Sequence, residues 1–154
     1  MAARPDAWTP IASFPGVARR NALTFTIGSQ VYVGGGLSFD RTSGNWLELR
    51  DLWVYDTSEN TWSARNDLPG PAQQGSRYWA LTPASAVVID DIAYVYSAAE
   101  IWRYETQEDT WTVTGGFPGD TEAAPVAFTD GTELLVGLGG HSEMRTISGY
   151  RLSV

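Results

Sequence analysis

The chain has 154 residues, with seven Trp, one His, no Cys and a formal net charge of −8. This length allows a single domain with a core of its own. The absence of Cys excludes disulfides, thiolate zinc sites and a Cys nucleophile. A single histidine, His141, cannot build a His-rich metal cage, so we expect no metal and no cofactor. The acidic balance argues against nucleic acid and anionic membrane surfaces as partners.

No apolar run reaches the roughly 20 residues that cross a bilayer. The first residues, Met1-Ala2-Ala3-Arg4-Pro5-Asp6, hold no apolar signal segment. Together with the lack of Cys, this predicts a cytoplasmic location.

An internal repeat organises the chain. Three tryptophans, spaced by 54 and then 49 residues (62−8, 111−62), are each followed six positions later by an apolar residue, Pro and Gly. The three matches are Trp8 with Phe14-Pro15-Gly16, Trp62 with Leu68-Pro69-Gly70 and Trp111 with Phe117-Pro118-Gly119. Tyr55 and Tyr104 stand seven positions before the second and third tryptophans, and we interpret Tyr150 as a third such tyrosine.

Short β-type segments lie between these markers, and no segment has a sustained helical period. First strands are expected at 22–27, 84–89 and 125–129, second strands at 30–34, 92–96 and 133–138, third strands at 52–56, 101–105 and 149–153, and fourth strands at 61–64, 110–113 and, near the N-terminus, 7–11. Gly28-Ser29 and Asp130-Gly131 suit two-residue hairpin turns, and Asp90-Asp91 is a weaker signal of the same kind. The sequence therefore predicts an all-β fold of four-stranded antiparallel units.

These units resemble the kelch repeat. The first unit has Tyr32-Val33-Gly34-Gly35-Gly36, Tyr55-Asp56 and Asn60-Thr61-Trp62. The second unit keeps Tyr94-Val95, Tyr104 and Asp109-Thr110-Trp111, and it has Ser97-Ala98 in place of the Gly pair. The third unit keeps Gly139-Gly140 and Tyr150, and it has Val136 at the first Tyr position. The resemblance implies blades of a β-propeller. We expect the Gly pairs to let inner strands approach the propeller axis and the aromatic markers to fill the space between sheets. These structural markers are Trp8, Gly35, Gly36, Tyr55, Trp62, Tyr104, Trp111, Gly139, Gly140 and Tyr150.

The repeat divides the chain into residues 17–70 as one blade, 71–119 as a second and 120–154 as a third without its outer strand. Residues 1–16 then supply an outer strand to a blade of another chain. Since propellers need four to eight blades to close, we expect a homodimer that forms a six-bladed ring by exchanging this strand. The alternative is a natural fragment or engineered half of a longer propeller.

Function is expected on the face that carries the connections from second to third and from fourth to first strands. Their lengths vary: from the Gly pair, or its Ser97-Ala98 replacement, to the next marker Tyr there are 19, 6 and 10 residues (55−36, 104−98, 150−140). Variable loops on a rigid scaffold are where binding sites concentrate. Arg forks suit carboxylates, and Trp and Tyr suit stacking. The candidate ligand-binding residues are Arg19, Arg20, Asp40, Arg41, Trp46, Arg77, Tyr78, Trp79, Glu100, His141, Glu143 and Arg145.

Each candidate also has a structural interpretation. Arg19, Arg20 and Arg77 can pair with a neighbouring blade, Trp46 and Trp79 can pack beneath their own loops, and His141 can fix a loop. The favoured function is a non-enzymatic binding or scaffold module for a protein or peptide, and next for an acidic carbohydrate.

An enzyme is the competing hypothesis. Kelch-type copper-radical oxidases need a Cys that this chain lacks, and the acidic and His spacing of iron-dependent nitrile-specifier proteins is absent. Sialic-acid mutarotases are six-bladed kelch-type rings that bind the carboxylate through arginines and use an acid/base pair. Resemblance to them implies roles for Arg19, Arg20, Arg77, Glu100, His141 and Glu143, and a lectin with the same ligand is a related alternative.

Overall fold

The structure is a computed structural model and describes residues 8–69, 85–97, 100–116, 126–137 and 149–153. These ranges hold thirteen β-strands and no helix, so none of their residues forms a helix that could cross a membrane. The strands are β1 (Leu23–Ile27), β2 (Gln30–Gly34), β3 (Leu37–Asp40), β4 (Asn45–Glu48), β5 (Leu52–Asp56), β6 (Thr61–Arg65), β7 (Ser85–Ile89), β8 (Ile92–Ser97), β9 (Glu100–Glu105), β10 (Thr110–Gly116), β11 (Val126–Thr129), β12 (Glu133–Gly137) and β13 (Gly149–Ser153).

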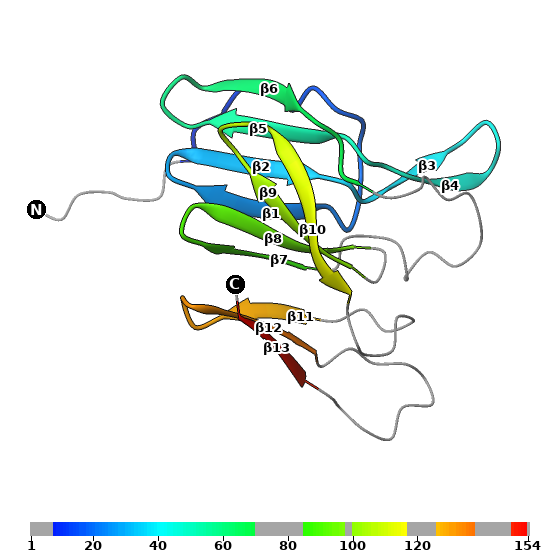
Figure 1. Ribbon diagram of the computed structural model, residues 1–154. Coiled ribbons are helices and arrows are strands. Elements are labelled where there is room, and N and C mark those ends of the chain that lie inside the picture. Colours follow the sequence, from blue (N-terminus) through cyan, green and yellow to red (C-terminus); the bar gives the residue numbers. More distant parts are fainter. Residues whose placement is uncertain (1–7, 70–84, 98–99, 117–125, 138–148, 154) are drawn as a thin grey trace, which may run out of the picture.

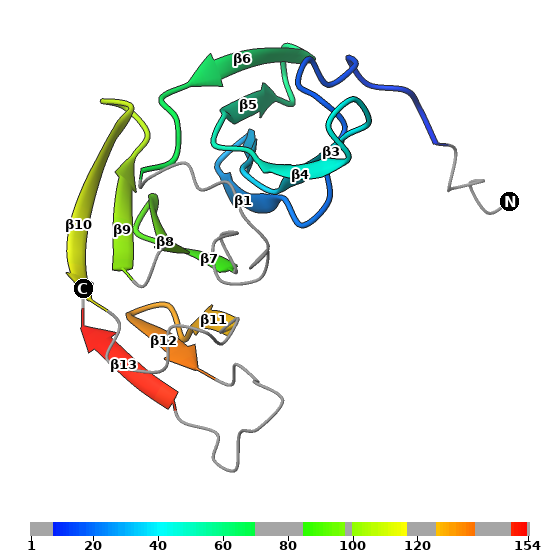
Figure 2. The same cartoon turned by 90° about the vertical axis from the view of Figure 1, so that its right-hand side faces the viewer.

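Three antiparallel sheets follow one another along the chain. Blade 1 has the order β1-β2-β5-β6, blade 2 the order β7-β8-β9-β10 and blade 3 the order β11-β12-β13. Figure 1 shows the sheets stacked in sequence order, and Figure 2, a quarter turn away, shows them fanning along an open arc with inner strands β1, β7 and β11 on its concave side. The predicted all-β architecture is confirmed.

Side-chain alternation explains why the sheets pack face to face. In β1, Leu23 and Phe25 are buried while Thr24 and Thr26 are exposed, as expected for a period of two. One apolar cluster joins blade 1 to blade 2, and a second joins blade 2 to blade 3. The hydrophobic core therefore lies between blades, in separate junctions.

The predicted N-terminal strand is not formed within this chain. Residues 8–11 have no strand partner, and the Trp8 side chain is 98% exposed. A strand needs the hydrogen-bonding edge of another strand, and within this chain residues 8–11 pair with no edge of the three sheets. Residue 7 lies outside the described ranges.

A hairpin that the sequence interpretation treated as loop lies between β2 and β5. Strands β3 and β4 pair from Leu37 with Glu48 to Asp40 with Asn45. Gly35 and Gly36, buried and with φ of 58° and 88°, direct the chain out of blade 1 into this hairpin. A Cβ on Gly36 would lie 2.6 Å from the Arg20 carbonyl oxygen. These glycines therefore allow the turn into the hairpin and its close contact with the Arg20 backbone. The expected approach of inner strands to the propeller axis is a separate role.

Blade 3 differs from the repeat at its third strand. Tyr55 pairs with Val31 and Tyr104 with Ala93, but the corresponding position of β13, opposite Leu134, is Leu152. Tyr150 pairs with Val136 instead, so our interpretation of Tyr150 as the third marker tyrosine was wrong by two positions. This register sets Leu152 against the buried Leu134, and a hydrophobic pattern of this kind fixes strand register. The side chain of Tyr150, and Gly139 and Gly140, lie outside the description.

Tight turns close the first hairpin of each blade. Asp90 and Asp91, the weaker turn signal, both have positive φ (49° and 61°), the conformation of a type I′ turn. Gly28 and Gly131 also have positive φ. The predicted two-residue connections are present in blades 1 and 2, and blade 3 uses a slightly longer turn.

Candidate functional site

Two faces of the arc carry different connections. The hairpin β3–β4 projects on the side where β2, β6, β8, β10 and β12 end, and the tight turns lie on the opposite side (Figure 1). We call these the loop face and the turn face. The strand directions agree with the prediction that the long connections share one face, and most residues of those connections lie outside the described ranges.

The hairpin is fixed at its base by the segment that enters blade 1. The backbone N–H of Arg20 donates to the Leu37 carbonyl at 2.9 Å, and the Leu37 N–H donates to the Arg20 carbonyl at 2.8 Å. At the same base, the Leu49 N–H, which follows β4, donates to the Gly36 carbonyl, which precedes β3. Arg20 is thereby held on the loop face by its own backbone.

The Arg20 side chain lies flat on an aromatic surface. Its guanidinium carbon is 3.6 Å from the ring centroid of Trp46, and the Phe39 ring lies 5.1 Å from Trp46 on the paired strand. Phe39 is 47% exposed, and no described carboxylate forms an ion pair with Arg20. Stacking on Trp leaves the edge donors of a guanidinium accessible. We call Arg20, Phe39 and Trp46 the Arg20 platform.

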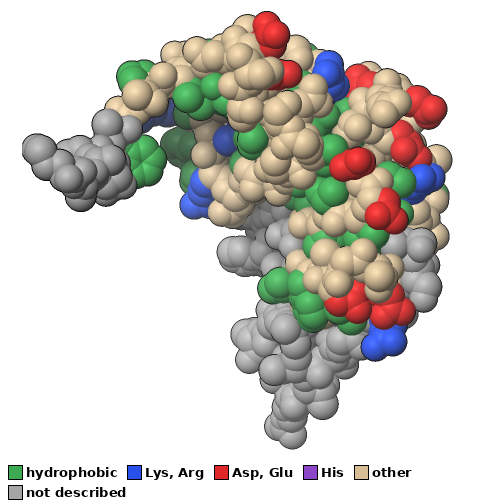
Figure 3. All heavy atoms as spheres, turned by 90° about the vertical axis from the view of Figure 1, so that its left-hand side faces the viewer, with side chains coloured by type: hydrophobic (Ala, Val, Ile, Leu, Met, Phe, Trp, Pro, Cys, Tyr) green, Lys and Arg blue, Asp and Glu red, His purple; other side chains and the backbone are tan. Residues whose placement is uncertain are grey.

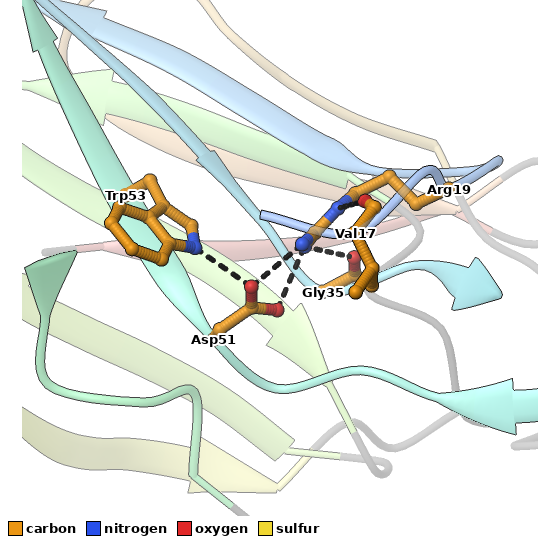
Figure 4. Close-up of polar contacts among 5 residues, drawn as sticks. All are labelled: Val17, Arg19, Gly35, Asp51 and Trp53. Atoms are coloured by element: carbon orange, nitrogen blue, oxygen red, sulfur yellow. Dashed lines mark hydrogen bonds and ion pairs between the residues drawn. The ribbon is translucent and has the colours of Figure 1, made fainter. Parts of the chain in front are cut away.

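Arg19 points into the protein and has a structural role. Its side chain is 6% exposed, and its two Nη atoms donate to both Asp51 carboxylate oxygens at 2.8 and 2.6 Å (Figure 4). Nη1 also donates to the Gly35 carbonyl and Nε to the Val17 carbonyl. Arg19 therefore has a structural role that braces the entry to blade 1, but its partner lies in its own blade and not in the neighbouring blade that the sequence interpretation named.

Asp51 is the acidic half of this brace. Burial would raise the pKa of its carboxyl group, but hydrogen bonds from Arg19 and Trp53, with the Arg19 charge, outweigh burial and lower the pKa. The Trp53 indole N–H lies 2.7 Å from the carboxylate. Sequence analysis missed Asp51, because its partner is 32 residues away and no local pattern joins them.

The other candidates are distributed differently. Asp40 organises the hairpin turn, because its carboxylate accepts hydrogen bonds from Ser43 Oγ and the Thr42 N–H, which lower its pKa. Arg41 is exposed at that turn, and Glu100 begins β9 on the loop face. The remaining candidates lie outside the described residues: Arg77, Tyr78, Trp79, His141, Glu143 and Arg145.

The turn face is acidic. Figure 3 shows carboxylates distributed over this face of the arc. Exposed Glu59, Asp90, Asp91, Glu108 and Asp130 occupy its tight turns. The cationic Arg20 platform and this acidic surface therefore lie on opposite faces. Among the described residues, no three His, Asp or Glu side chains gather as metal ligands.

These sheets, wound in an arc around a common side, define the class of protein: blades of a β-propeller. Residues 18–69 match the kelch motif, and the structure superposes on that of YjhT, a kelch-type propeller, with a TM-score of 0.66 and 16% identity, covering 84% of this chain and 47% of YjhT. Residues 18–69 are therefore a kelch motif, and the fold of the chain is that of the blades of a kelch-type propeller.

Three curated relatives match shorter segments. The N-acetylneuraminate epimerase of Salmonella arizonae is 26% identical over 81 residues, or 53% of this chain and 21% of the relative. That of Yersinia enterocolitica is 36% identical over 56 residues, and N-acetylneuraminate epimerase 1 of Escherichia coli O6:H1 is 38% identical over 55 residues; each match covers 36% of this chain and 14% of the relative. The matched segments thus span about a fifth or less of the relatives' length.

Proposed function

We propose that this chain is a kelch-type binding module that takes an anionic ligand on its loop face, first an acidic peptide segment of a protein partner and second an acidic carbohydrate. The Arg20 platform is the observation that carries this proposal. Its guanidinium is already oriented by Trp46, so less side-chain freedom is lost when it binds a carboxylate.

The charge distribution supports the same face. An anion is repelled by the exposed carboxylates of the turn face, whereas the platform combines a cation with apolar surface from Phe39. Arg19 does not contribute to this site, because Asp51 and backbone carbonyls occupy its donors. The proposal therefore assigns different functions to two adjacent arginines.

We further propose that two copies complete the scaffold as a six-bladed ring. The three blades form an open arc (Figure 2), and the chain spans 47% of YjhT. In a ring of two such arcs related by a two-fold axis, each end blade packs against an end blade of the other copy. Two-fold symmetry is the commonest symmetry of homo-oligomers.

Titration calorimetry with an oligo-glutamate peptide and with N-acetylneuraminate tests the binding proposal. We expect at least one anion to bind the full chain and Arg20→Ala to weaken it at least tenfold, while Arg20→Lys retains part of the affinity. Arg41→Ala removes the same charge from the turn of the same hairpin and should weaken binding less than Arg20→Ala does. Equal affinity of the Arg20→Ala and native proteins contradicts the assignment.

A second candidate function is epimerisation of N-acetylneuraminate, favoured by the three relatives of that name. In this hypothesis Arg20 holds the carboxylate, and the acid/base pair comes from Glu100, His141 and Glu143. Exchange NMR of N-acetylneuraminate anomers distinguishes the two functions. Faster exchange that is lost in Glu100→Gln or His141→Ala indicates an enzyme, and an unchanged rate with measurable binding indicates a binding module.

A further inference from the structure

The blades are joined by a repeated set of contacts that we call the interblade clasp. In blade 1, Asn60 Oδ1 accepts the backbone N–H of Ala12 at 2.8 Å, and the Trp62 indole N–H donates to the Ala12 carbonyl at 2.9 Å. Ala12 belongs to the segment entering blade 1. Asn60 and the Trp62 indole thus hold the backbone N–H and C=O of one incoming residue.

Blade 2 repeats the clasp on the segment that leaves blade 1. The Asp109 carboxylate accepts the Asn66 N–H at 2.9 Å, and the Trp111 indole donates to the Asn66 carbonyl at 3.2 Å. Asn60 and Asp109 each stand two residues before their Trp, with a φ of 54°. A shared backbone conformation and shared partners show that the clasp is a property of the repeat.

The clasped residue also has a fixed place in its own strand. Asn66 follows Trp62 of the outer strand β6 by four residues, and Ala12 follows Trp8 by four. Asp6 stands two residues before Trp8, as Asn60 and Asp109 do before their tryptophans. Residues 8–11 therefore have the register of an outer strand, although they pair with none of the three blades.

Blade 3 offers the matching edge. Strand β13 pairs only with β12 among the described strands, while the equivalent β5 and β9 each pair on both sides. An open cavity of about 380 Å³ lies between blades 2 and 3, lined by Ile89, Asp90, Ile92, Tyr94, Arg103, Thr114 and Leu152. At the junction of blades 1 and 2, Tyr104 occupies the position of Leu152, and Trp111 packs on it at 4.5 Å.

We propose that Trp8 of a second copy fills this cavity while residues 8–11 of that copy pair with β13 as the outer strand of blade 3. The register follows blade 2: Trp111 pairs with Tyr104, so Trp8 pairs with Leu152 and Thr9 with Arg151. The Trp8 indole then donates to the receiving backbone at Gly115–Gly116, completing a third clasp. This inference rests on the proposed closure of the ring by a second copy.

Engineered cysteines test the register without background, since the chain has no Cys. Paired antiparallel positions lie about 4.5–5.5 Å apart at Cα, within disulfide range. Thr9→Cys and Arg151→Cys proteins, mixed and oxidised, should form a covalent dimer that contains one of each chain. Thr9→Cys mixed with Thr129→Cys is the control and should not cross-link. A mixture of Thr9→Cys and Arg151→Cys that fails to cross-link overturns the exchange.

Light scattering distinguishes the strand exchange proposed here from the closure of the ring by a second copy. We expect the native chain at twice the mass of one chain, Trp8→Ala to raise the dimer dissociation constant at least tenfold, and Leu47→Ala, at an exposed apolar residue of the β3–β4 hairpin, to leave it unchanged. A Trp8→Ala protein that dimerises normally overturns the exchange but retains closure by a second copy. A native chain that is monomeric at all concentrations overturns both.

Discussion

The junction between blades 1 and 2 and the junction between blades 2 and 3 have the same design with different contents. In the first, Tyr104 is fully buried against Phe25, Tyr32 and Trp111. In the second, Leu152 takes the place of Tyr104, and about 380 Å³ remains open beside it. The outer strand explains the difference, because it brings the Trp that covers the junction. A kelch blade without this strand has secondary structure but an incomplete core.

Burial at the first junction also affects chemistry. Burial raises the pKa of the Tyr104 hydroxyl, and its hydrogen bond to Asp109 raises it further. Tyr104 is therefore a neutral donor at any physiological pH. It connects the apolar junction to the clasp, a connection that Leu152 cannot make.

The largest expected effect comes from making the first junction resemble the second. Tyr104→Leu removes the ring packed on Trp111 and the hydroxyl donor to Asp109, and should lower the free energy of unfolding by about 2–4 kcal/mol. Urea denaturation at one fixed protein concentration measures it. The reverse change, Leu152→Tyr, gives the second junction the residue type that Trp111 packs on in the first and should alter stability by less than about 1 kcal/mol. Equal losses from both variants would show that the junctions are equivalent.

Removal of one clasp acceptor should have the next largest effect. Asp109→Ala leaves the Tyr104 hydroxyl without its acceptor and puts Ala at a φ of 54°, so we expect a loss of about 2 kcal/mol. Asp109→Asn retains an acceptor and tolerates this φ, so it should lose under about 1 kcal/mol. If the two variants unfold at the same urea concentration, the clasp hydrogen bonds do not stabilise the junction.

The Arg19–Asp51 brace predicts a pH dependence at the other end of the arc. The lowered pKa of Asp51 stabilises the fold above the unfolded value near 3.8, and this stabilisation is lost as the pH falls through the folded value. Below about pH 4 the native protein should therefore lose more stability than Asp51→Asn, by roughly 1 kcal/mol given the partly exposed carboxylate. Urea denaturation of both proteins at pH 5.5 and pH 3 measures this difference. An equal loss of stability in both proteins would show that Asp51 does not cause the pH dependence.

The smallest effect concerns the turn beside the open junction. Asp91 has a φ of 61°, and Gly adopts this conformation at lower cost. Asp91→Gly should raise the free energy of unfolding by about 0.5 kcal/mol. A loss of stability, measured by thermal unfolding, would indicate that the Asp91 side chain has a partner that matters more than the backbone conformation.

The sequence predicts the blades well because local signals set them. Alternation and turn residues place β1, β2 and β5–β12 within one or two residues of their observed bounds, apart from the longer β10. Hairpin β3–β4 was missed, although Asp40 and Gly44, joined by a turn hydrogen bond, are a local signal for it. The register of β13 could not be predicted from Tyr150, because strand pairing depends on the opposite residue, Leu134.

The candidate site also depends on contacts between residues that are distant in the sequence. Arg19 and Arg20 are adjacent and identical in type, yet one is buried against Asp51 and the other stacks on Trp46. Their functions are decided by residues 32 and 26 positions away (51−19, 46−20). Sequence analysis selected both as candidates, and only tertiary contacts separate them.

The mass of the native chain in solution tests the proposed closure by a second copy most directly, because that proposal accounts for both the open junction and the unpaired Trp8 segment. Light scattering across a range of protein concentrations should give twice the mass of one chain. A mass of one chain throughout, with the β-sheet circular dichroism intact, would contradict the account.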